Sequence, residues 1–388
     1  MTAYERMKRM KFVFAPDSFK GSLTAQEMCA FLAEEAQRAF PGCETVSLPV
    51  ADGGEGTADA LATACGGEMR RARVTGPMGE PAEAHFALLP GGAAVVEMAQ
   101  ASGLPLVTGK KNPLAASSFG TGELILRALD AGAERLLIGI GGSATNDGGM
   151  GMLSALGARF YGAQGETLRG SGAELACAAR ADFDGLDARL ARTQIEVICD
   201  VTNPLLGPDG ATVVYGPQKG VTPAMSTALE AGMANYAALL ENTLGRDVSR
   251  FPGAGAAGGM GAALGGVLGA RLKKGIDAVL DAVDFNARIA GCDAVFTGEG
   301  RIDRQSVAFG KATAGVARRC RKQDVPVIAI VGGMGPGAEA FYDEGRVSIF
   351  TTVNGPMTVE TAIKNAAPLY RDAARRAFQT LAIGRGLK

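Results

Sequence analysis

Residues 11–40 read KFVFAPDSFKGSLTAQEMCAFLAEEAQRAF, which is an apolar strand, a polar loop and then a helix. The run 11–15 has the length and composition of a buried strand. Thr24 and Glu27 have the spacing of a capping box, so a helix is predicted to begin after Thr24. The same alternation returns after residue 293. Strands are predicted at 294–296, 326–331 and 346–350, and helices at 312–321 and 358–381.

The middle of the chain follows a different pattern. Residues 71–74, 82–89 and 93–98 alternate apolar and polar side chains between Gly and Pro turns, which predicts an antiparallel meander. We therefore predict an α/β fold with two domains. A Rossmann- or flavodoxin-like parallel-sheet domain comprises residues 1–72 and 288–388, and a mixed α/β domain of residues 73–287 is inserted in it.

Composition excludes several classes of function. The 388 residues carry 39 basic and 40 acidic side chains, so no basic surface for nucleic acid is expected. No run of about 18 apolar residues is present, and no membrane segment is expected. The seven cysteines form no Cys-x-x-Cys pair, which favours reduced thiols in the cytoplasm and argues against zinc. The expected partners are small molecules, bound by a monomer or a homodimer.

The single histidine restricts the choice of a general base. His85 lies in an alternating strand pattern, with no glycine loop beside it. A strand position near the surface is the simpler interpretation of such a residue. Any general base is therefore predicted to be a carboxylate or a lysine.

The common nucleotide-binding signatures are absent or weak. A Walker A loop needs Gly-x-x-x-x-Gly-Lys-Ser/Thr, but Leu104 and Gln305 replace the first glycine before Gly109-Lys110 and Gly310-Lys311. Residues 139–144 fit Gly-x-Gly-x-x-Gly/Ala, yet no acid follows at the end of the next strand. An NAD(P)-dependent dehydrogenase of a small 2-hydroxy acid is therefore the alternative function. A periplasmic-type binding protein, also with two α/β lobes, is a third.

Three loops combine glycines with acids after short apolar runs. They are 51–57 (ADGGEGT), 139–149 (GIGGSATNDGG) and 297–303 (TGEGRID). Glycine allows a backbone to approach a ligand closely, and a following helix N-terminus attracts anions. Carboxylates suit Mg²⁺ or a general base. The three loops predict phosphoryl transfer to a small anion.

The predicted site residues lie in these loops and at the ends of strands. Asp200 ends a strand and is the candidate base; Lys20, Asp147 and Lys219 complete the predicted catalytic set. Lys219, between two glycines, could equally be a solvated turn lysine. Glu299 and Asp303 are the predicted Mg²⁺ ligands. The predicted substrate or phosphate contacts are Asp17, Ser18, Ser22, Gly53, Glu55, Gly141, Gly142, Ser143, Asn146, Asn203, Gln218, Arg301, Ser306 and Lys311.

Longer motifs give a resemblance to a known family. They are APDSFKG (15–21), VADGGEGT (50–57), GGSATNDGG (141–149), CDVTNPL (199–205), GPQKG (216–220) and TGEGRID (297–303). From about residue 12 to the C-terminal helix, the chain resembles the bacterial glycerate kinase family, class I, of the glycerate 2-kinase type.

The resemblance implies two α/β domains, ATP with Mg²⁺ as phosphoryl donor and D-glycerate as acceptor. It favours the 2-hydroxyl and 2-phosphoglycerate as product, with the 3-hydroxyl as the alternative. It also implies service in glyoxylate, glycolate or sugar-acid breakdown. The residue roles given above follow from chemistry and not from the resemblance.

Overall fold

The structure is a computed structural model that describes residues 10–51, 56–308 and 311–386. The chain divides into two compact units. Unit 1 comprises Met1–Asp52 and Val279–Lys388, and unit 2 is Gly53–Ala278. The structure places the two boundaries between the units at 52/53 and 278/279. The boundaries predicted from the sequence, 72/73 and 287/288, both lie further along the chain. Helix α3 (Thr57–Cys65) and strand β3 (Glu68–Thr75) belong to unit 2, because β3 pairs with β4 (Pro81–Leu89).

Unit 1 contains a five-stranded, wholly parallel sheet. Its strands stand in the order β14 (Val347–Thr351), β13 (Val327–Val331), β12 (Ala294–Gly298), β1 (Lys11–Pro16), β2 (Glu44–Ser47). Numbered within the unit, this is the flavodoxin-like order 2-1-3-4-5. The predicted α/β class is confirmed.

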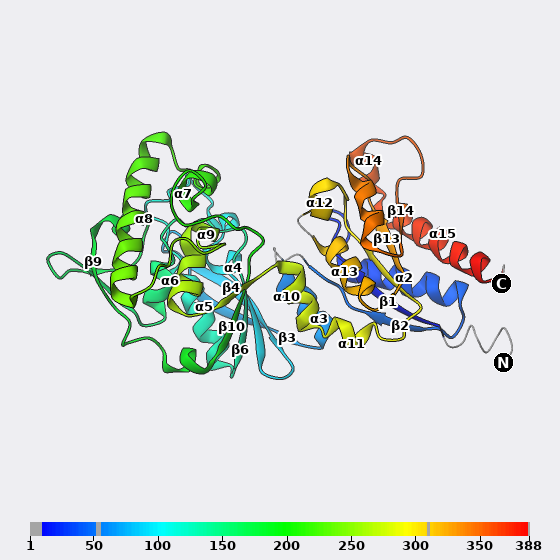
Figure 1. The fold of residues 1–388 in the computed structure, drawn as a ribbon, viewed down its shortest axis with the longest axis horizontal. Coiled ribbons are helices and arrows are strands. Elements are labelled where there is room, and N and C mark those ends of the chain that lie inside the picture. Colours follow the sequence, from blue (N-terminus) through cyan, green and yellow to red (C-terminus); the bar gives the residue numbers. More distant parts are fainter. Residues whose placement is uncertain (1–9, 52–55, 309–310, 387–388) are drawn as a thin grey trace. The chain divides into compact units, whose positions relative to one another are not determined.

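Helices cover both faces of this sheet (Figure 1). Helices α2 (Ala25–Ala39) and α15 (Ala366–Gly386) share one face, where their apolar side chains join Phe12, Phe14 and Phe296 in one core. The ring of Phe378, on α15, stacks on Phe296 with centroids 4.3 Å apart. Helix α13 (Ala312–Arg321) packs against β1, β12 and β13. The remaining helices are α10 (Gly275–Ala282, which crosses the boundary between the units), α11 (Phe285–Arg288), α12 (Arg304–Ala308), the 3-10 helix η6 (Ala338–Glu344) and α14 (Val359–Lys364).

Local sequence signals fix the ends of two of these helices. The capping box predicted for α2 is present, with Glu27 N donating to Thr24 Oγ1 at 3.2 Å. The single helix predicted at 358–381 is instead two, α14 and α15, separated at Asn365. Pro368 has no N–H for the carbonyl four residues earlier, so a continuous helix would lose that bond, whereas proline is tolerated in a first turn.

Unit 2 has a six-stranded mixed sheet in the order β11 (Arg271–Lys273), β10 (Gln194–Ile198), β6 (Arg135–Gly139), β5 (Ala93–Glu97), β4, β3. The predicted meander is confirmed, because β3, β4 and β5 pair antiparallel, whereas β5, β6, β10 and β11 pair parallel. A second, antiparallel sheet holds β8 (Thr167–Leu168), β7 (Arg159–Gly162) and β9 (Ala178–Asp182).

Besides α3, six helices in the described part of unit 2 lie around one large apolar core. They are α4 (Ala99–Ser102), α5 (Phe119–Asp130), α6 (Met150–Ala155), α7 (Ala211–Tyr215), α8 (Pro223–Leu244) and α9 (Ala256–Gly261). Short 3-10 turns lie at η1 (Leu104–Leu106), η2 (Glu174–Cys177), η3 (Ala188–Arg192) and η4 (Pro217–Lys219), and η5 (Ala262–Val267) is a π-helical turn. No helix among the described residues is long and apolar enough to cross a membrane. None of the seven cysteines is paired.

Candidate active site

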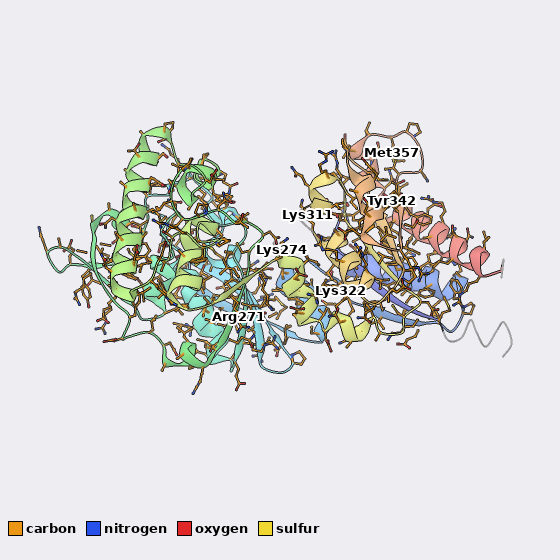
Figure 2. All side chains as sticks on the ribbon, viewed as in Figure 1. Arg271, Lys274, Lys311, Lys322, Tyr342 and Met357 are labelled. Carbon is orange, nitrogen blue, oxygen red and sulfur yellow. The ribbon has the colours of Figure 1, made fainter. Side chains whose placement is uncertain are left out.

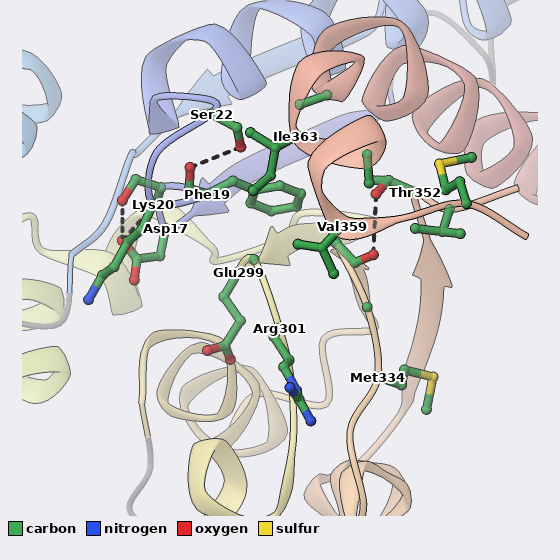
Figure 3. A pocket seen from close by; sticks show the side chains of 18 of the residues that line it. Asp17, Phe19, Lys20, Ser22, Glu299, Arg301, Met334, Thr352, Val359 and Ile363 are labelled. Carbon is green, nitrogen blue, oxygen red and sulfur yellow. Dashed lines mark hydrogen bonds between the residues drawn. The ribbon is translucent and has the colours of Figure 1, made fainter.

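The first candidate site is a pocket of about 700 Å³ in unit 1 (Figure 3). It lies where β1, β12, β13 and β14 end, which is the edge at which open parallel sheets bind ligands. Lys311 and Met357, labelled in Figure 2, come from separate parts of its wall. Seven residues predicted from the sequence line it: Asp17, Ser18, Lys20, Ser22, Glu299, Arg301 and Lys311.

Two carboxylates occupy matching positions on neighbouring strands of this pocket. Pro16 of β1 is in register with Gly298 of β12, and Asp17 N donates to Gly298 O at 2.9 Å. Asp17 and Glu299 therefore follow the two central strands side by side. Their exposed fractions are 8% and 9%, so both are largely desolvated at the pocket wall. This is the point where the strand order reverses, and ligands of flavodoxin-like sheets bind at that point.

The loop after β12 fixes Glu299 by local hydrogen bonds. Ser306 Oγ donates to Glu299 Oε2 at 3.2 Å. Asp303 Oδ1 accepts from the backbone N–H groups of Ser306 and Gln305, and these bonds lower the pKa of Asp303. The Asp303 carboxylate thus caps α12 and does not line the pocket. Of the two predicted Mg²⁺ ligands, Glu299 alone lies on the pocket wall.

The cations and hydroxyls of the pocket come from three loops. Lys20, Arg301 and Lys311 are exposed side chains on its wall. Ser18 donates to Asp17 Oδ1 through its N–H at 2.7 Å, and Ser22 Oγ donates to Phe19 O at 3.1 Å. The loop is therefore held in shape by its own short-range bonds, and its charged side chains face the pocket.

A part of the wall was not predicted. It includes the Gly332-Gly333 turn after β13 and apolar side chains from Met334, Val359 and Ile363. Val359 and Ile363 are four residues apart in a segment that the sequence pattern assigns to a continuous helix. The two apolar residues at helical spacing were the feature of the sequence from which this part of the wall could have been predicted.

The second candidate site, in unit 2, is buried. The Asp147 carboxylate has no exposure and accepts four hydrogen bonds, from Ser118 N and Oγ at 2.7 Å each and from Gly149 N and Gly151 N at 3.2 and 3.3 Å. Burial nevertheless raises its pKa. The carboxylate ties the loop after β6 to the start of α5 and of α6.

Lys219 is buried as well, with an exposed fraction of 2%. Its Nζ donates to Thr145 O at 2.7 Å, and desolvation lowers its pKa to about 7, against an opposing effect of Asp147. A solvated turn lysine is therefore not what the structure shows. The buried ammonium fixes the carbonyl of the same loop that Asp147 holds.

The rest of this loop is tightly packed. Asn146 is buried; its Nδ2 donates to Thr212 Oγ1 at 3.1 Å, and its Oδ1 has no protein partner. A left-handed turn at Ala257, Gly258 and Gly259 packs against it. A Cβ on Gly258 would lie 2.1 Å from Thr145 O, so only glycine permits this approach.

Four further predicted residues of this loop region differ in exposure. Ser143 is 5% exposed, whereas Gly141 and Gly142 are exposed before it. Gln218 is also exposed, and its carbonyl accepts from Lys111 Nζ at 2.8 Å.

Asp200 and Asn203 follow β10 in unit 2. Asp200 is exposed, and its Oδ1 accepts from Gly275 N at 2.7 Å. Asn203 accepts from Tyr215 OH at 2.6 Å and donates to Asp209 O at 2.8 Å, so it shapes its own loop. Gly53 and Glu55 lie outside the described residues. His85 Nε2, on β4, lies 3.6 Å from Asp59 Oδ2, and His85 is not among the residues that line the pocket of unit 1.

The described residues contain no group of three or more His, Cys, Asp or Glu side chains placed to hold a metal ion. This does not count against Mg²⁺, because in phosphoryl-transfer sites one or two carboxylates suffice and phosphate and water complete the shell. Asp17 and Glu299 are a donor pair of that kind.

The dinucleotide fingerprint at 139–144 lacks its structural context. Gly139 ends β6, but the next helix, α6, begins only at Met150. The fingerprint requires a helix that opens directly at the glycines. The dehydrogenase alternative therefore has no support from this segment.

Comparison with known proteins assigns the family. The model of the Glycerate kinase family matches residues 12–382. Glycerate kinase of Bacillus subtilis (strain 168) is 49% identical over 368 residues, which cover 94% of this chain and 96% of that protein. Glycerate 2-kinase of Escherichia coli (strain K12) is 46% identical over 377 residues, covering 97% and 99%. A crystal structure from Salmonella typhimurium LT2, assigned as a glycerate kinase 2, has 45% identity and a TM-score of 0.89 over 97% of this chain and 100% of that one. The chain therefore belongs to the glycerate kinase family, and it is a kinase.

Proposed function

We propose that the protein transfers the γ-phosphoryl group of ATP to the 2-hydroxyl of D-glycerate, forming 2-phosphoglycerate and ADP. The observation that carries the proposal is the pocket of unit 1, where the carboxylates of Asp17 and Glu299 lie among Lys20, Arg301 and Lys311 at the strand ends. Phosphoryl transfer depends mainly on positioning and on stabilising charge, and this set supplies both signs. We further propose that the reaction serves glyoxylate, glycolate or sugar-acid breakdown.

In this reaction the glycerate oxygen forms a bond to the γ-phosphorus, and the bond from that phosphorus to the bridging oxygen of ADP breaks. The hydroxyl proton passes to a carboxylate; Asp200 is our candidate, because it is the exposed acid after β10. The cations neutralise charge on the equatorial oxygens. Asp17 and Glu299 would hold Mg²⁺, which would offset the negative charge of the phosphates.

In unit 2, we assign Asp147 and Lys219 to positioning. The Asp147 carboxylate is bonded to Ser118, Gly149 and Gly151, and Lys219 Nζ is bonded to Thr145 O. Both side chains are buried and are not exposed to a ligand. The exposed Gly141 and Gly142 and the neighbouring Ser143 are the parts of that loop available for the substrate carboxylate. Backbone N–H groups of glycine loops are suitable donors to such an anion.

The test is an assay of ADP release by the purified chain with Mg²⁺, ATP and D-glycerate, with L-glycerate and no acceptor as controls. We expect release that depends on D-glycerate. Adding enolase to the product separates the two regiochemistries, because enolase consumes 2-phosphoglycerate and not 3-phosphoglycerate. No release above the acceptor-free control would contradict the proposal, and an enolase-resistant product would move transfer to the 3-hydroxyl.

A further inference from the structure

The pocket of unit 1 has an apolar end that the transfer reaction itself does not need. Met334, Val359 and Ile363 line it, although they are 46%, 76% and 47% exposed to solvent. Large apolar side chains left in water and gathered in one cavity mark a place for an apolar ligand surface. Figure 3 shows Val359 and Ile363 in the part of the pocket near Phe19, apart from Asp17 and Lys20.

This apolar wall is built to be rigid. Thr358 caps α14, with its Oγ1 accepting from Thr361 N at 3.2 Å, and the helix carries Val359 and Ile363 one turn apart. Behind them, Phe19 is 6% exposed, and its ring packs edge-on against Tyr370 at 5.6 Å. The wall is thus formed in the protein before any ligand binds.

The same pocket also carries three cations. Lys20, Arg301 and Lys311 line it with the Gly332-Gly333 turn, and Figure 3 shows Lys20 beside Asp17 and Arg301 between Glu299 and Met334. A ligand that fills the whole cavity must therefore have an apolar part and a polyanionic part. Glycerate, with three carbons that all carry oxygen, has no surface to cover Val359 and Ile363. A nucleoside triphosphate has a base with apolar faces and a charged phosphate chain.

We propose that unit 1 holds the entire nucleotide, with the purine base against Met334, Val359 and Ile363 and the phosphates at the strand ends. The proposal rests on the proposed function for the choice of a nucleoside triphosphate. It adds the location of the base, and hence assigns the acceptor to groups outside this apolar wall.

The experiment measures displacement of a fluorescent ATP analogue from the full chain without glycerate, using adenosine and tripolyphosphate as separate competitors. Ile363→Asp places a charge on the apolar wall. Ile383→Asp is the matched control, because Ile383 is also an exposed isoleucine on a helix of unit 1, 65% exposed and outside the pocket. Arg301→Met removes one of the three cations that line the pocket.

We expect Ile363→Asp to weaken adenosine at least tenfold, which is about 1.4 kcal/mol or more, and to leave tripolyphosphate unchanged. Arg301→Met should weaken the binding of tripolyphosphate and leave that of adenosine unchanged. Ile383→Asp should change the binding of neither competitor. Retained tripolyphosphate binding also shows that the Ile363 variant is folded. Equal adenosine affinity in wild type and Ile363→Asp would overturn the proposal even if glycerate is phosphorylated. The expected pattern without any turnover of glycerate would sustain the nucleotide site and refute only the proposed function.

Discussion

The two units use the same sequence feature, glycines beside an acid, in opposite ways. In unit 1 the feature lies at the ends of β1 and β12, and its side chains line an open pocket. In unit 2 it follows β6. There Asp147 is buried and bonded to Ser118 at the start of α5, and Lys219 of η4 is buried and bonded to Thr145 O of the loop. The sequence motif by itself therefore does not distinguish a ligand-binding loop from a buried loop whose polar groups bond within the protein.

What differs is the structure that packs against each loop. The loop after β12 is followed by a short helix that begins at Arg304, and the pocket side is left open. The loop after β6 is covered by the left-handed turn at 257–259. Within this turn Gly258 approaches Thr145, and Gly259 approaches Gly148, too closely for any residue but glycine. The turn at 257–259, which is distant in the sequence, thus buries a loop whose sequence suggests a ligand site.

The comparison predicts its largest effect for Glu299→Gln. The change removes the negative charge at the pocket wall but keeps the shape that accepts from Ser306. We expect kcat to fall about 1000-fold, or about 4 kcal/mol, because a neutral amide would hold Mg²⁺ less well and the charge of the reacting phosphate would be less offset. The midpoint of thermal unfolding should move by less than about 4 °C.

Glu339→Gln is the control for that variant, since Glu339 is an exposed glutamate of unit 1 outside the pocket. Steady-state kinetics and a thermal melt on both proteins decide the matter. A Glu299 variant that turns over like the control would remove the pocket of unit 1 from the reaction.

The second prediction concerns the stability of unit 2. Asp147→Ala leaves four buried donors without an acceptor and Lys219 without a nearby negative charge. We expect a loss of about 3 kcal/mol in the free energy of unfolding, measured with urea. Asp147→Asn should lose less, because one oxygen still accepts. Asp184→Ala, at an exposed aspartate of unit 2, should be neutral. A catalytic Asp147 would give the opposite pattern, an inactive Asn variant of wild-type stability.

The fold was predictable where its determinants are local or periodic. The capping box of α2 involves residues three apart, and the apolar runs of β1, β12 and β13 report burial directly. The polar half of the pocket followed as well, since carboxyl ends of parallel strands meet at one edge.

The remainder depends on tertiary contacts that no local pattern records. The apolar wall joins Met334 to Val359 and Ile363, which only the fold brings together. A lysine between two glycines suggests an exposed turn, yet η4 places Lys219 against Thr145 and buries it. Asp303 was predicted as a metal ligand because acids near strand ends suit metals. Its hydrogen bonds to α12 became apparent only with the helix boundary.

The third prediction tests the exposed acid of unit 2. Asp200 differs from Asp147 in being exposed, and its Oδ1 accepts from Gly275 N. We expect Asp200→Asn to fold normally and to lose at least about 100-fold in kcat, as for removal of a general base. Asp209→Asn, at another exposed aspartate of the unit, is the control. Near-normal turnover would place the base in unit 1, with Glu299 as the next candidate.

The last prediction concerns pH and Lys219. Burial lowers the pKa of Lys219 to about 7 in the folded protein, against about 10.4 in an unfolded chain. Between these values Lys219 binds more protons in the unfolded chain than in the folded one, so this residue makes the free energy of unfolding rise with pH. The contribution of Lys219 to the free energy of unfolding rises by at most about 1.4 kcal/mol per pH unit. It is absent below pH 7, where Lys219 is protonated in both the folded and the unfolded chain.

Lys219→Met should lose this rise, while Lys111→Met, at an exposed lysine whose Nζ donates to Gln218 O, should keep it. Asp147 acts electrostatically on Lys219, and the Tyr236 ring packs against Gly148 of the same loop; all three proteins retain both residues. The pKa of Tyr236 is raised by burial, so its phenol stays neutral across this window. Urea unfolding between pH 7 and 10 measures the three slopes. Parallel plots of unfolding free energy against pH for wild type and Lys219→Met would mean that Lys219 is charged in both the folded and the unfolded chain. Lys219 would then form an ion pair with Asp147 and would not be a desolvated neutral amine.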